Sequence, residues 1–288
     1  MKQITIKIRD IKISNSRSFV LFGGINVLES YEISEIICEH FINITKKLKI
    51  PYVFKASFDK ANRTHYKSYR GVGLKNGMKI FKKLKDKFNV LIMTDVHERE
   101  QVKIVKNFVD IIQIPAFLAR QTDLIEEIAK SGMPINVKKP QFLSHEQVKY
   151  IIEKIRNFGN KKIILCERGN VFGYENLVVD MLGFNIIKVV SNGLPVIFDA
   201  SHSLQKRNSK NKKSCSGRNW QIFNLSQSAI CSRIAGLFVE SYFNPEDAKC
   251  DGFSSLPIKE LENFLQQIKK VDTLIKSFPE KRIGKVEF

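Results

Sequence analysis

Polar and charged side chains stand at the ends of eight short apolar runs along this chain. The protein interior tolerates unpaired charge poorly, so these side chains must pair with each other, with water or with a ligand. Three of them are cations, and two further cations, Lys60 and Arg63, follow shortly after the second run. The pattern predicts an anionic ligand that carries two phosphates and a carboxylate. The eight residues are Asn26, Lys55, Asp95, Gln113, Lys138, Arg168, His202 and Glu240.

The two later cations each have a functional and a structural interpretation. Lys138 and Lys139 stand between Asn-Val and a proline, which favours a role in binding over a solvated strand end. Arg168 follows Glu167 directly and could form a salt bridge with it. A planar guanidinium also suits a phosphate, and this second interpretation is the favoured one.

The acid and imidazole groups are less specific. Asp95 and His97 in the segment TDVHE fit either a loop cap or a site, because aspartate is common in loops. His202 taken alone could also be a structural histidine whose hydrogen bonds are satisfied at a strand end. The remaining histidines, His40, His65 and His145, are expected on the surface or on helices.

The apolar runs alternate with stretches of helical spacing. Eight strand–helix alternations predict parallel strands that close into a (β/α)8 barrel, whose catalytic face is the carboxyl end of the strands. An open doubly wound sheet is the rival, but GGIN after the first run is not the glycine-rich phosphate turn typical of that fold. The runs are Phe19–Asn26, Tyr52–Ser57, Val90–Val96, Ile111–Phe117, Pro134–Pro140, Lys162–Gly169, Pro195–His202 and Gly236–Tyr242.

Four other segments complete the expected fold. Residues 1–15 alternate as a small β-hairpin with its turn at Arg9-Asp10. Ser144 and Gln147 have the spacing of a capping box at the start of a helix. A final helix is expected from Ile258 to about Ser277, with Leu274 on its buried face. Residues 206–218 are polar and predict a long loop of the kind that often covers an active site.

Length and composition limit the class of protein. A chain of 288 residues suits one barrel domain spanning residues 1–288, and 43% hydrophobic with 27% charged residues is ordinary for a folded protein. The net charge of +19 raises the possibility of nucleic-acid binding. Its lysines are scattered over most predicted helices, however, and no nucleic-acid-binding motif is present. We therefore expect no nucleic-acid partner.

The chain is expected to work in the cytoplasm without a membrane anchor. Its N-terminus, MKQITIKIRD, lacks the apolar core of a signal peptide, and no run approaches the ~18 apolar residues of a membrane span. The five cysteines form no CxxC pair. They are interpreted as free thiols in a reducing compartment.

Nine segments in order resemble the 3-deoxy-8-phosphooctulonate synthase family, also called 2-dehydro-3-deoxyphosphooctonate aldolase. The resemblance spans almost the whole chain. KANR is its most specific element, because the related 3-deoxy-7-phosphoheptulonate synthases have a KPRT-like motif there. The segments are FGGINVLES, IPYVFKASFDKANRT, SYRGVGL, TDVHE, IQIPAFLARQTDL, INVKKPQF, GYENLVVDM, VIFDASHSLQ and KCDGFSSLP.

The resemblance implies a condensation of phosphoenolpyruvate, arabinose 5-phosphate and water to 3-deoxy-octulosonate 8-phosphate and phosphate. This product feeds lipopolysaccharide biosynthesis. The resemblance also implies that Lys138 and Arg168 bind the phosphoenolpyruvate phosphate. Lys55 and Lys60 then lie near its carboxylate, with Gln113 at the same site. Such cations would neutralise both anions and hold the alkene against the aldehyde.

The sugar phosphate is assigned in the same way. Asn62, Arg63 and Thr64 match the family's sugar-phosphate loop, and Asp95 matches an acceptor for a sugar hydroxyl. Arg120 resembles a residue that reaches the sugar phosphate of a neighbouring subunit, which implies a homotetramer.

The resemblance also bears on metal use. One branch of the family binds a metal through a cysteine together with residues that match His202, Glu240 and Asp251, but this chain has Asn26 at the cysteine position. Loss of a thiolate removes the ligand best suited to a borderline-soft ion, so we expect no metal and no other cofactor. Asn26, Lys60, His202 and Asp251 form the predicted catalytic group, in which His202 is a candidate proton carrier.

The chain departs from the family in the polar loop. The segment from Ser214 to Arg218 reads Ser-Cys-Ser-Gly-Arg, where the family usually has consecutive glycines before the arginine. Asn208 stands where aspartate is common, and three lysines cluster at 210, 212 and 213. Two other functions remain open at this point. One is a 3-deoxy-7-phosphoheptulonate synthase that uses erythrose 4-phosphate, and the other is a basic nucleic-acid-binding protein on a barrel that has lost its activity. The KANR motif argues against the first, and the complete set of polar strand ends argues against the second.

Overall fold

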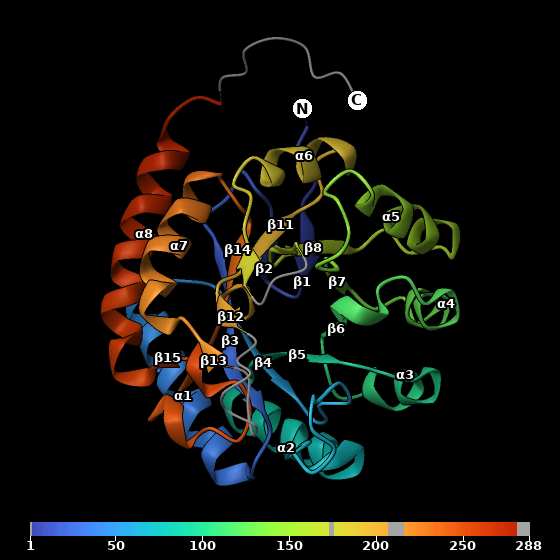
Figure 1. Cartoon of the computed structure of the whole chain (residues 1–288), viewed down its shortest axis with the longest axis vertical. Coiled ribbons are helices and arrows are strands. Elements are labelled where there is room, and N and C mark those ends of the chain that lie inside the picture. Colours follow the sequence, from blue (N-terminus) through green and yellow to red (C-terminus); the bar gives the residue numbers. More distant parts are fainter. Residues whose placement is uncertain (1, 173–175, 207–215, 281–288) are drawn as a thin grey trace.

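A closed barrel of eight parallel strands organises the structure, which is a computed structural model describing residues 2–172, 176–206 and 216–280. Each strand pairs with the next along the chain, and the last pairs with both its predecessor and the first (Figure 1). This confirms the predicted (β/α)8 barrel and excludes an open sheet. The strands are β3 (Val20–Val27), β4 (Tyr52–Ser57), β5 (Leu91–Asp95), β6 (Ile111–Ile114), β7 (Ile135–Lys138), β8 (Ile163–Glu167), β11 (Val196–Asp199) and β14 (Gly236–Tyr242).

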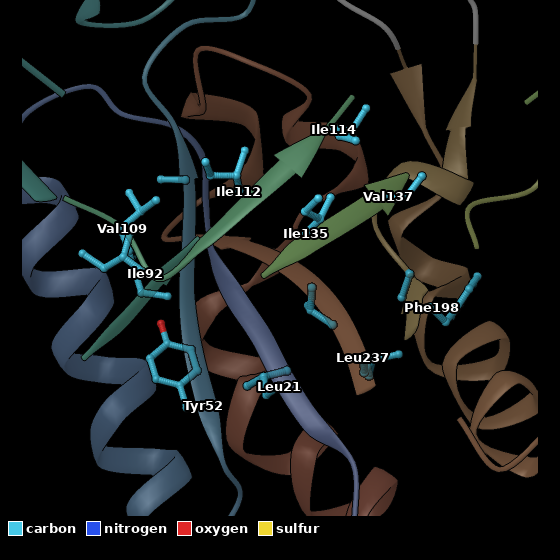
Figure 2. Close-up of a cluster of buried hydrophobic side chains, with 14 of the residues drawn as sticks. Leu21, Tyr52, Ile92, Val109, Ile112, Ile114, Ile135, Val137, Phe198 and Leu237 are labelled. Carbon is cyan, nitrogen blue, oxygen red and sulfur yellow. The ribbon is translucent and has the colours of Figure 1, made fainter. Parts of the chain in front are cut away.

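Helices follow the strands and surround the barrel (Figure 1). Apolar side chains on the outer face of the strands meet the buried faces of these helices, and Figure 2 shows part of this layer around Leu21, Ile112 and Phe198. Burial of this layer fixes the strand ends in space. The helices are α1 (Tyr31–Leu48), α2 (Gly73–Phe88), α3 (Arg99–Val105), α4 (Thr122–Lys130), α5 (Val148–Asn157), α6 (Gly183–Val190), α7 (Ile222–Cys231) and α8 (Leu261–Ser277).

A β-hairpin covers the amino end of the barrel. Strands β1 (Ile6–Ile8) and β2 (Ile11–Ile13) pair antiparallel around Arg9, whose φ of 51° is in the left-handed region. Side chains of both strands join the cluster that fills the barrel interior, together with Phe22 and Phe238. The predicted hairpin is therefore confirmed. Because it covers the amino end, only the carboxyl ends of the strands are left to hold a site.

Short elements build the loops beyond the carboxyl ends. The chain before and after residues 207–215 pairs as β12 and β13, whereas the middle of the predicted covering loop lies outside the described residues. The short strands are β9 (Asn170–Val171), β10 (Leu177–Val178), β12 (Gln205–Lys206), β13 (Ser216–Gly217) and β15 (Leu256–Pro257). The 3₁₀ turns are η1 (Ala116–Leu118), η2 (His202–Leu204), η3 (Asn219–Gln221), η4 (Pro245–Asp247), η5 (Gly252–Ser254) and η6 (Ile258–Glu260).

Three local predictions are wrong. Ser144 does not cap α5, because residues 145–147 form a turn and the helix begins at Val148 without a side-chain cap. His145 is buried instead of lying on the surface. Leu274 is 60% exposed, since α8 turns this position away from the barrel. Helix α8 begins at Leu261, directly after the 3₁₀ turn η6, and ends at Ser277 as expected.

An irregularity in β3 sets the direction of Asn26. The pairing of β3 with β4 shifts register between Gly24 and Val27. Close approach of the two strands requires glycine, because a Cβ at Gly24 would lie 2.2 Å from the carbonyl oxygen of Lys55. Bulges bend a strand and redirect its side chains. The glycine therefore permits the bend that precedes Asn26.

Candidate active site

The polar residues predicted at the strand ends gather at the carboxyl end of the barrel. All of them except His202 are buried, and the His202 side chain is only 12% exposed. Seven of them form one connected network with three further residues, Ser57, Asp199 and Asp251, whereas Gln113 accepts a hydrogen bond from Asn136 on the neighbouring strand. A polar network of this extent inside a barrel requires good mutual pairing, because buried polar groups without partners are costly.

Asn26 lies at the centre of one half of this network. Its Nδ2 donates to Glu240 Oε2 at 2.5 Å and to Asp251 Oδ2 at 3.4 Å, and it lies 3.4 Å from His202 Nε2. Its Oδ1 is buried and has no hydrogen-bond partner among the described residues. The amide nitrogen thus faces three side chains at once, and the amide oxygen is free to accept a hydrogen bond from a ligand or water.

Lys55 connects Asn26's partner Glu240 to Asp95. Its Nζ lies 3.5 Å from Glu240 Oε1 and 3.7 Å from Asp95 Oδ1, and it donates to Ser57 Oγ at 3.0 Å. Burial lowers the pKa of Lys55, and the nearby charge of Lys60 lowers it further. Burial acts the same way on Lys60, but the carboxylates of Glu240 and Asp95 outweigh it and raise its pKa. Both lysines are therefore attracted by the carboxylates of Glu240 and Asp95.

Asp199 organises the other half of the network. It accepts a hydrogen bond from Lys138 Nζ, and its Oδ2 lies 2.8 Å from His202 Nδ1. Backbone nitrogens of Ser201 and His202 donate to its Oδ1 at 3.1 and 2.8 Å. Burial alone would raise the pKa of Asp199, but His202 and Lys138 hold it well below its usual range. An ionised carboxylate therefore fixes Lys138 and His202 side by side.

Arg168 keeps its guanidinium away from carboxylates in the described part of the chain. Its Nη2 donates to Gln205 Oε1 at 2.8 Å and to the His202 carbonyl oxygen at 3.4 Å. Its Nε is buried without a partner. The structural alternative, a salt bridge to Glu167, is wrong, because only the backbone nitrogen of Arg168 bonds to that carboxylate. A guanidinium held by neutral acceptors remains available to an anion.

The loop after β4 carries the three residues predicted to bind the sugar phosphate, and it brings one of them into contact with the network. Arg63 Nη1 lies 3.8 Å from Asp251 Oδ1 and contacts Cys250 Sγ. Asn62 and Thr64 are both exposed on the same loop. Arg120 is exposed and follows η1 closely in the sequence. Its expected role depends on a neighbouring subunit.

Sequence reasoning missed several residues of the site. Asp199 is the last residue of β11, three positions before His202. The presence of two polar residues so close to one strand end is the sequence pattern that could have predicted it. Gln205 Nε2 donates to Asp251 Oδ2 at 2.9 Å, although nothing in the sequence around it marked this role. Asn136 donates to Gln113 Oε1 at 3.1 Å from the neighbouring strand. Its position inside β7 hid it among apolar neighbours.

The geometry around Asn26 shows whether its donor set suits a metal. Within residues 2–172, 176–206 and 216–280, no group of three or more His, Cys, Asp or Glu side chains is arranged to hold an ion. Asn26 directs its amide hydrogens at Glu240 and Asp251, so the lone pairs that would bind a cation already accept hydrogen bonds. The residues present therefore fit an amide-centred network better than a metal centre.

Removal of the Asp95 charge should destabilise the protein in a pH-dependent way. Burial raises the pKa of Asp95, but Lys55 and the hydrogen bond to His97 outweigh it and leave the pKa well below its usual value. A depressed pKa adds stability above the unfolded value, about 3.9, and this stability is lost as the pH falls. Asp95→Asn should therefore be less stable than the wild type near neutral pH, by a gap that shrinks below about pH 4.

Urea unfolding across this pH range measures the gap. Asp123→Asn, a change at an aspartate whose side chain is 75% exposed on α4, is the control and should show a small gap throughout. A gap for Asp95→Asn that stays constant as the pH falls would contradict the ionised Asp95 pair.

Comparison with known proteins places the chain in a family. The model described as the DAHP synthetase I family matches residues 3–277. The protein named 2-dehydro-3-deoxyphosphooctonate aldolase from Cronobacter sakazakii is 56% identical over 280 residues, 97% of this chain and 98% of that protein. Proteins of the same name from Erwinia tasmaniensis and Haemophilus influenzae are 57% and 56% identical, each over 97% of this chain and 98% of its own length. The chain therefore belongs to the DAHP synthetase I family, and within it to the 2-dehydro-3-deoxyphosphooctonate aldolases.

Proposed function

We propose that the chain condenses phosphoenolpyruvate with D-arabinose 5-phosphate and water to give 3-deoxy-D-manno-octulosonate 8-phosphate and inorganic phosphate. The observation that carries this proposal is the network at the barrel mouth. It gathers Lys55, Lys138 and Arg168 at one end of the barrel, in a chain closely similar to proteins named for this product. A substrate with a phosphate and a carboxylate on neighbouring carbons matches such a set of cations.

Phosphoenolpyruvate is assigned to the cations around Asp199 and Glu240. Lys138 and Arg168 bind the phosphate, since the Nε of Arg168 has no partner among the described residues and Lys138 is held in the network by Asp199. Lys55 and Lys60 neutralise the carboxylate, assisted by Gln113. Positive charge on both ends fixes the plane of the alkene, which is the orientation that carbon–carbon bond formation requires.

Arabinose 5-phosphate is assigned to the loop after β4 and to Asp95. Asn62, Arg63 and Thr64 bind its phosphate, and the exposure of Thr64 leaves its hydroxyl open to a ligand. Asp95 accepts a sugar hydroxyl. A homotetramer is also proposed, in which Arg120, exposed after η1, completes the sugar-phosphate site of a neighbouring subunit.

The chemistry needs one new carbon–carbon bond and one carbon–oxygen bond to water. The enol carbon of phosphoenolpyruvate attacks the sugar aldehyde, and a proton reaches the new alkoxide. Water adds to the carbon that carries the phosphate ester, and the phosphate leaves with its bridging oxygen. His202 contacts both Asp199 and the Asn26–Glu240 pair, so it can carry the proton between the two halves of the network. Asn26 and Asp251 hold water and substrate by hydrogen bonds, and Lys60 adds positive charge to this catalytic group.

No metal is required in this proposal, since the Asn26 amide occupies the centre of the residues that match a metal site in the other branch of the family. A cytoplasmic location is also proposed. In the described residues, Cys38, Cys166, Cys231 and Cys250 are free thiols, as expected in a reducing compartment. No helix in the described residues is long and apolar enough to cross a membrane.

The proposed route of phosphate release can be tested with phosphoenolpyruvate that carries heavy oxygen at the bridging position. The label should appear in inorganic phosphate, because cleavage falls between carbon and oxygen. Release should require arabinose 5-phosphate. Label retained in the organic product would contradict the proposed addition of water to the carbon that carries the phosphate ester.

A further inference from the structure

Three ionisable residues form a buried cluster behind the phosphate-binding cations, outside the network described above. We name Lys139, His145 and Glu167 the Glu167 cluster. Glu167 Oε1 lies 3.7 Å from Lys139 Nζ, and Glu167 Oε2 lies 3.2 Å from His145 Nε2. The Glu167 and Lys139 side chains are at most 1% exposed. Burial of such charges is unfavourable for stability unless they are well paired, which favours a functional role for the cluster.

The cluster joins the two loops that carry the cations. Lys139 Nζ donates to the carbonyl oxygens of Pro140 and Gly169 at 3.2 and 3.3 Å and to Asn170 Oδ1 at 2.9 Å. Lys139 follows Lys138 directly, and Gly169 follows Arg168 directly. The loops after β7 and β8 are therefore tied to each other one residue away from the pair of cations.

The direction of the Glu167 carboxylate is the second observation. Its Oε1 accepts from the backbone nitrogens of Arg168 and Gly169 at 2.9 and 2.5 Å, and its charge faces Lys139 and His145. Burial alone would raise the pKa of Glu167, but His145 and Lys139 lower it, so the group is ionised at neutral pH. An ionised carboxylate next to Arg168 in the sequence is thus kept off its guanidinium.

The packing around His145 supports a fixed arrangement. A Cβ at Gly183, the first residue of α6, would lie 2.2 Å from His145 Nε2. The imidazole therefore fills the space against this turn of α6. It cannot move toward α6 to release Glu167, and the carboxylate remains held away from the Arg168 guanidinium.

We propose that the Glu167 cluster is a positioning device for phosphoenolpyruvate binding: Lys139 and His145 hold the Glu167 carboxylate away from the Arg168 guanidinium, which leaves that cation free of a competing carboxylate when the substrate phosphate binds. This inference rests on the proposed function. It assigns Lys139 a role distinct from that of Lys138, because Lys139 bonds to the backbone oxygens of the two loops.

Lys139→Met tests the proposal. The freed carboxylate should turn to Arg168 and raise the KM for phosphoenolpyruvate about tenfold or more, the size of one charge-assisted hydrogen bond, with a smaller change in kcat. Adding Glu167→Gln to Lys139→Met should bring the KM back to within about threefold of the wild type, because the competing charge is gone. A cluster that served stability alone would make the double variant no better than the single one.

Lys276→Met is the matched control. Lys276 Nζ lies 2.6 Å from Asp272 Oδ1 in a similarly buried pair on α8, and it also donates to the carbonyl oxygen of Ile234, which precedes β14 at the amino end of the barrel. This variant should lower the melting temperature without raising the KM. If Lys139→Met does not fold, His145→Leu replaces it in this test, because it frees the same carboxylate. The variant that combines His145→Leu with Glu167→Gln then replaces the double variant.

Calorimetric titration with phosphoenolpyruvate separates the possible failures. Wild-type protein that does not bind phosphoenolpyruvate would overturn the proposed function and this inference with it. Wild-type binding together with an unchanged KM in a folded Lys139→Met or His145→Leu variant would overturn the inference alone. A double variant with a KM as high as that of the single variant would also overturn the inference and leave the proposed function intact.

Discussion

Lys138→Met should lower kcat/KM for phosphoenolpyruvate by about 100- to 1000-fold, the cost of removing a donor that stabilises developing charge. Lys138 is buried at the end of β7 and donates to Asp199, which also lies against His202. Its loss removes a cation from the phosphate and also leaves the Asp199 carboxylate with less compensating charge. That carboxylate would then repel the incoming anion.

Steady-state kinetics with varied phosphoenolpyruvate measures this effect. Lys149→Met removes an exposed lysine on α5 and should leave kcat/KM unchanged, which controls for the loss of one charge from a strongly basic protein. Lys138→Met combined with Asp199→Asn should recover part of the melting temperature but little activity, because it removes the excess carboxylate charge without restoring the missing cation. A loss of less than about tenfold in a folded Lys138→Met variant would contradict the role of Lys138 as a phosphate ligand.

Asn26→Cys should convert the enzyme into one that depends on a divalent metal. The amide nitrogen of Asn26 faces His202, Glu240 and Asp251 at 2.5 to 3.4 Å. A thiolate there would add a soft ligand to one imidazole and two carboxylates, a set suited to a borderline ion such as Zn²⁺.

The expected result is a chelator-treated variant with less than about a tenth of its metal-loaded activity, restored by adding the divalent ion. Wild-type activity should not change under the same treatment. Asn26→Ser is the control, since it removes the amide but supplies no thiolate, and its residual activity should respond to neither chelator nor metal. An Asn26→Cys protein that binds no metal, or is equally active without it, would contradict the proposed place of Asn26 at the centre of the network.

The fold could be predicted from the sequence because its signals are local. Apolar runs at the length of strands alternate with helical spacing, and the order of such elements determines the barrel. The ends of elements were harder to place. Ser144 and Gln147 have capping-box spacing, but residues 145–147 form a turn in which His145 reaches Glu167, so tertiary contacts overrode the local preference.

The candidate site shows the same division. Lys55, Lys138 and Glu240 were found because each interrupts an apolar run, and a charge in such a place needs a partner. Asp199 was missed because the strand end could not be located between it and His202. The direction of Glu167 also could not be predicted, since adjacent residues in sequence gave no sign that its carboxylate would face Lys139 and not Arg168.

Phosphate release from phosphoenolpyruvate in the presence of either arabinose 5-phosphate or erythrose 4-phosphate, with and without a chelator, tests the central claim most directly. Release is expected with arabinose 5-phosphate only, at a rate that the chelator does not lower. Release with erythrose 4-phosphate instead would identify a heptulosonate synthase, and loss of activity with the chelator would contradict the metal-free site around Asn26. Release with neither sugar would contradict the assignment of this network as an active site.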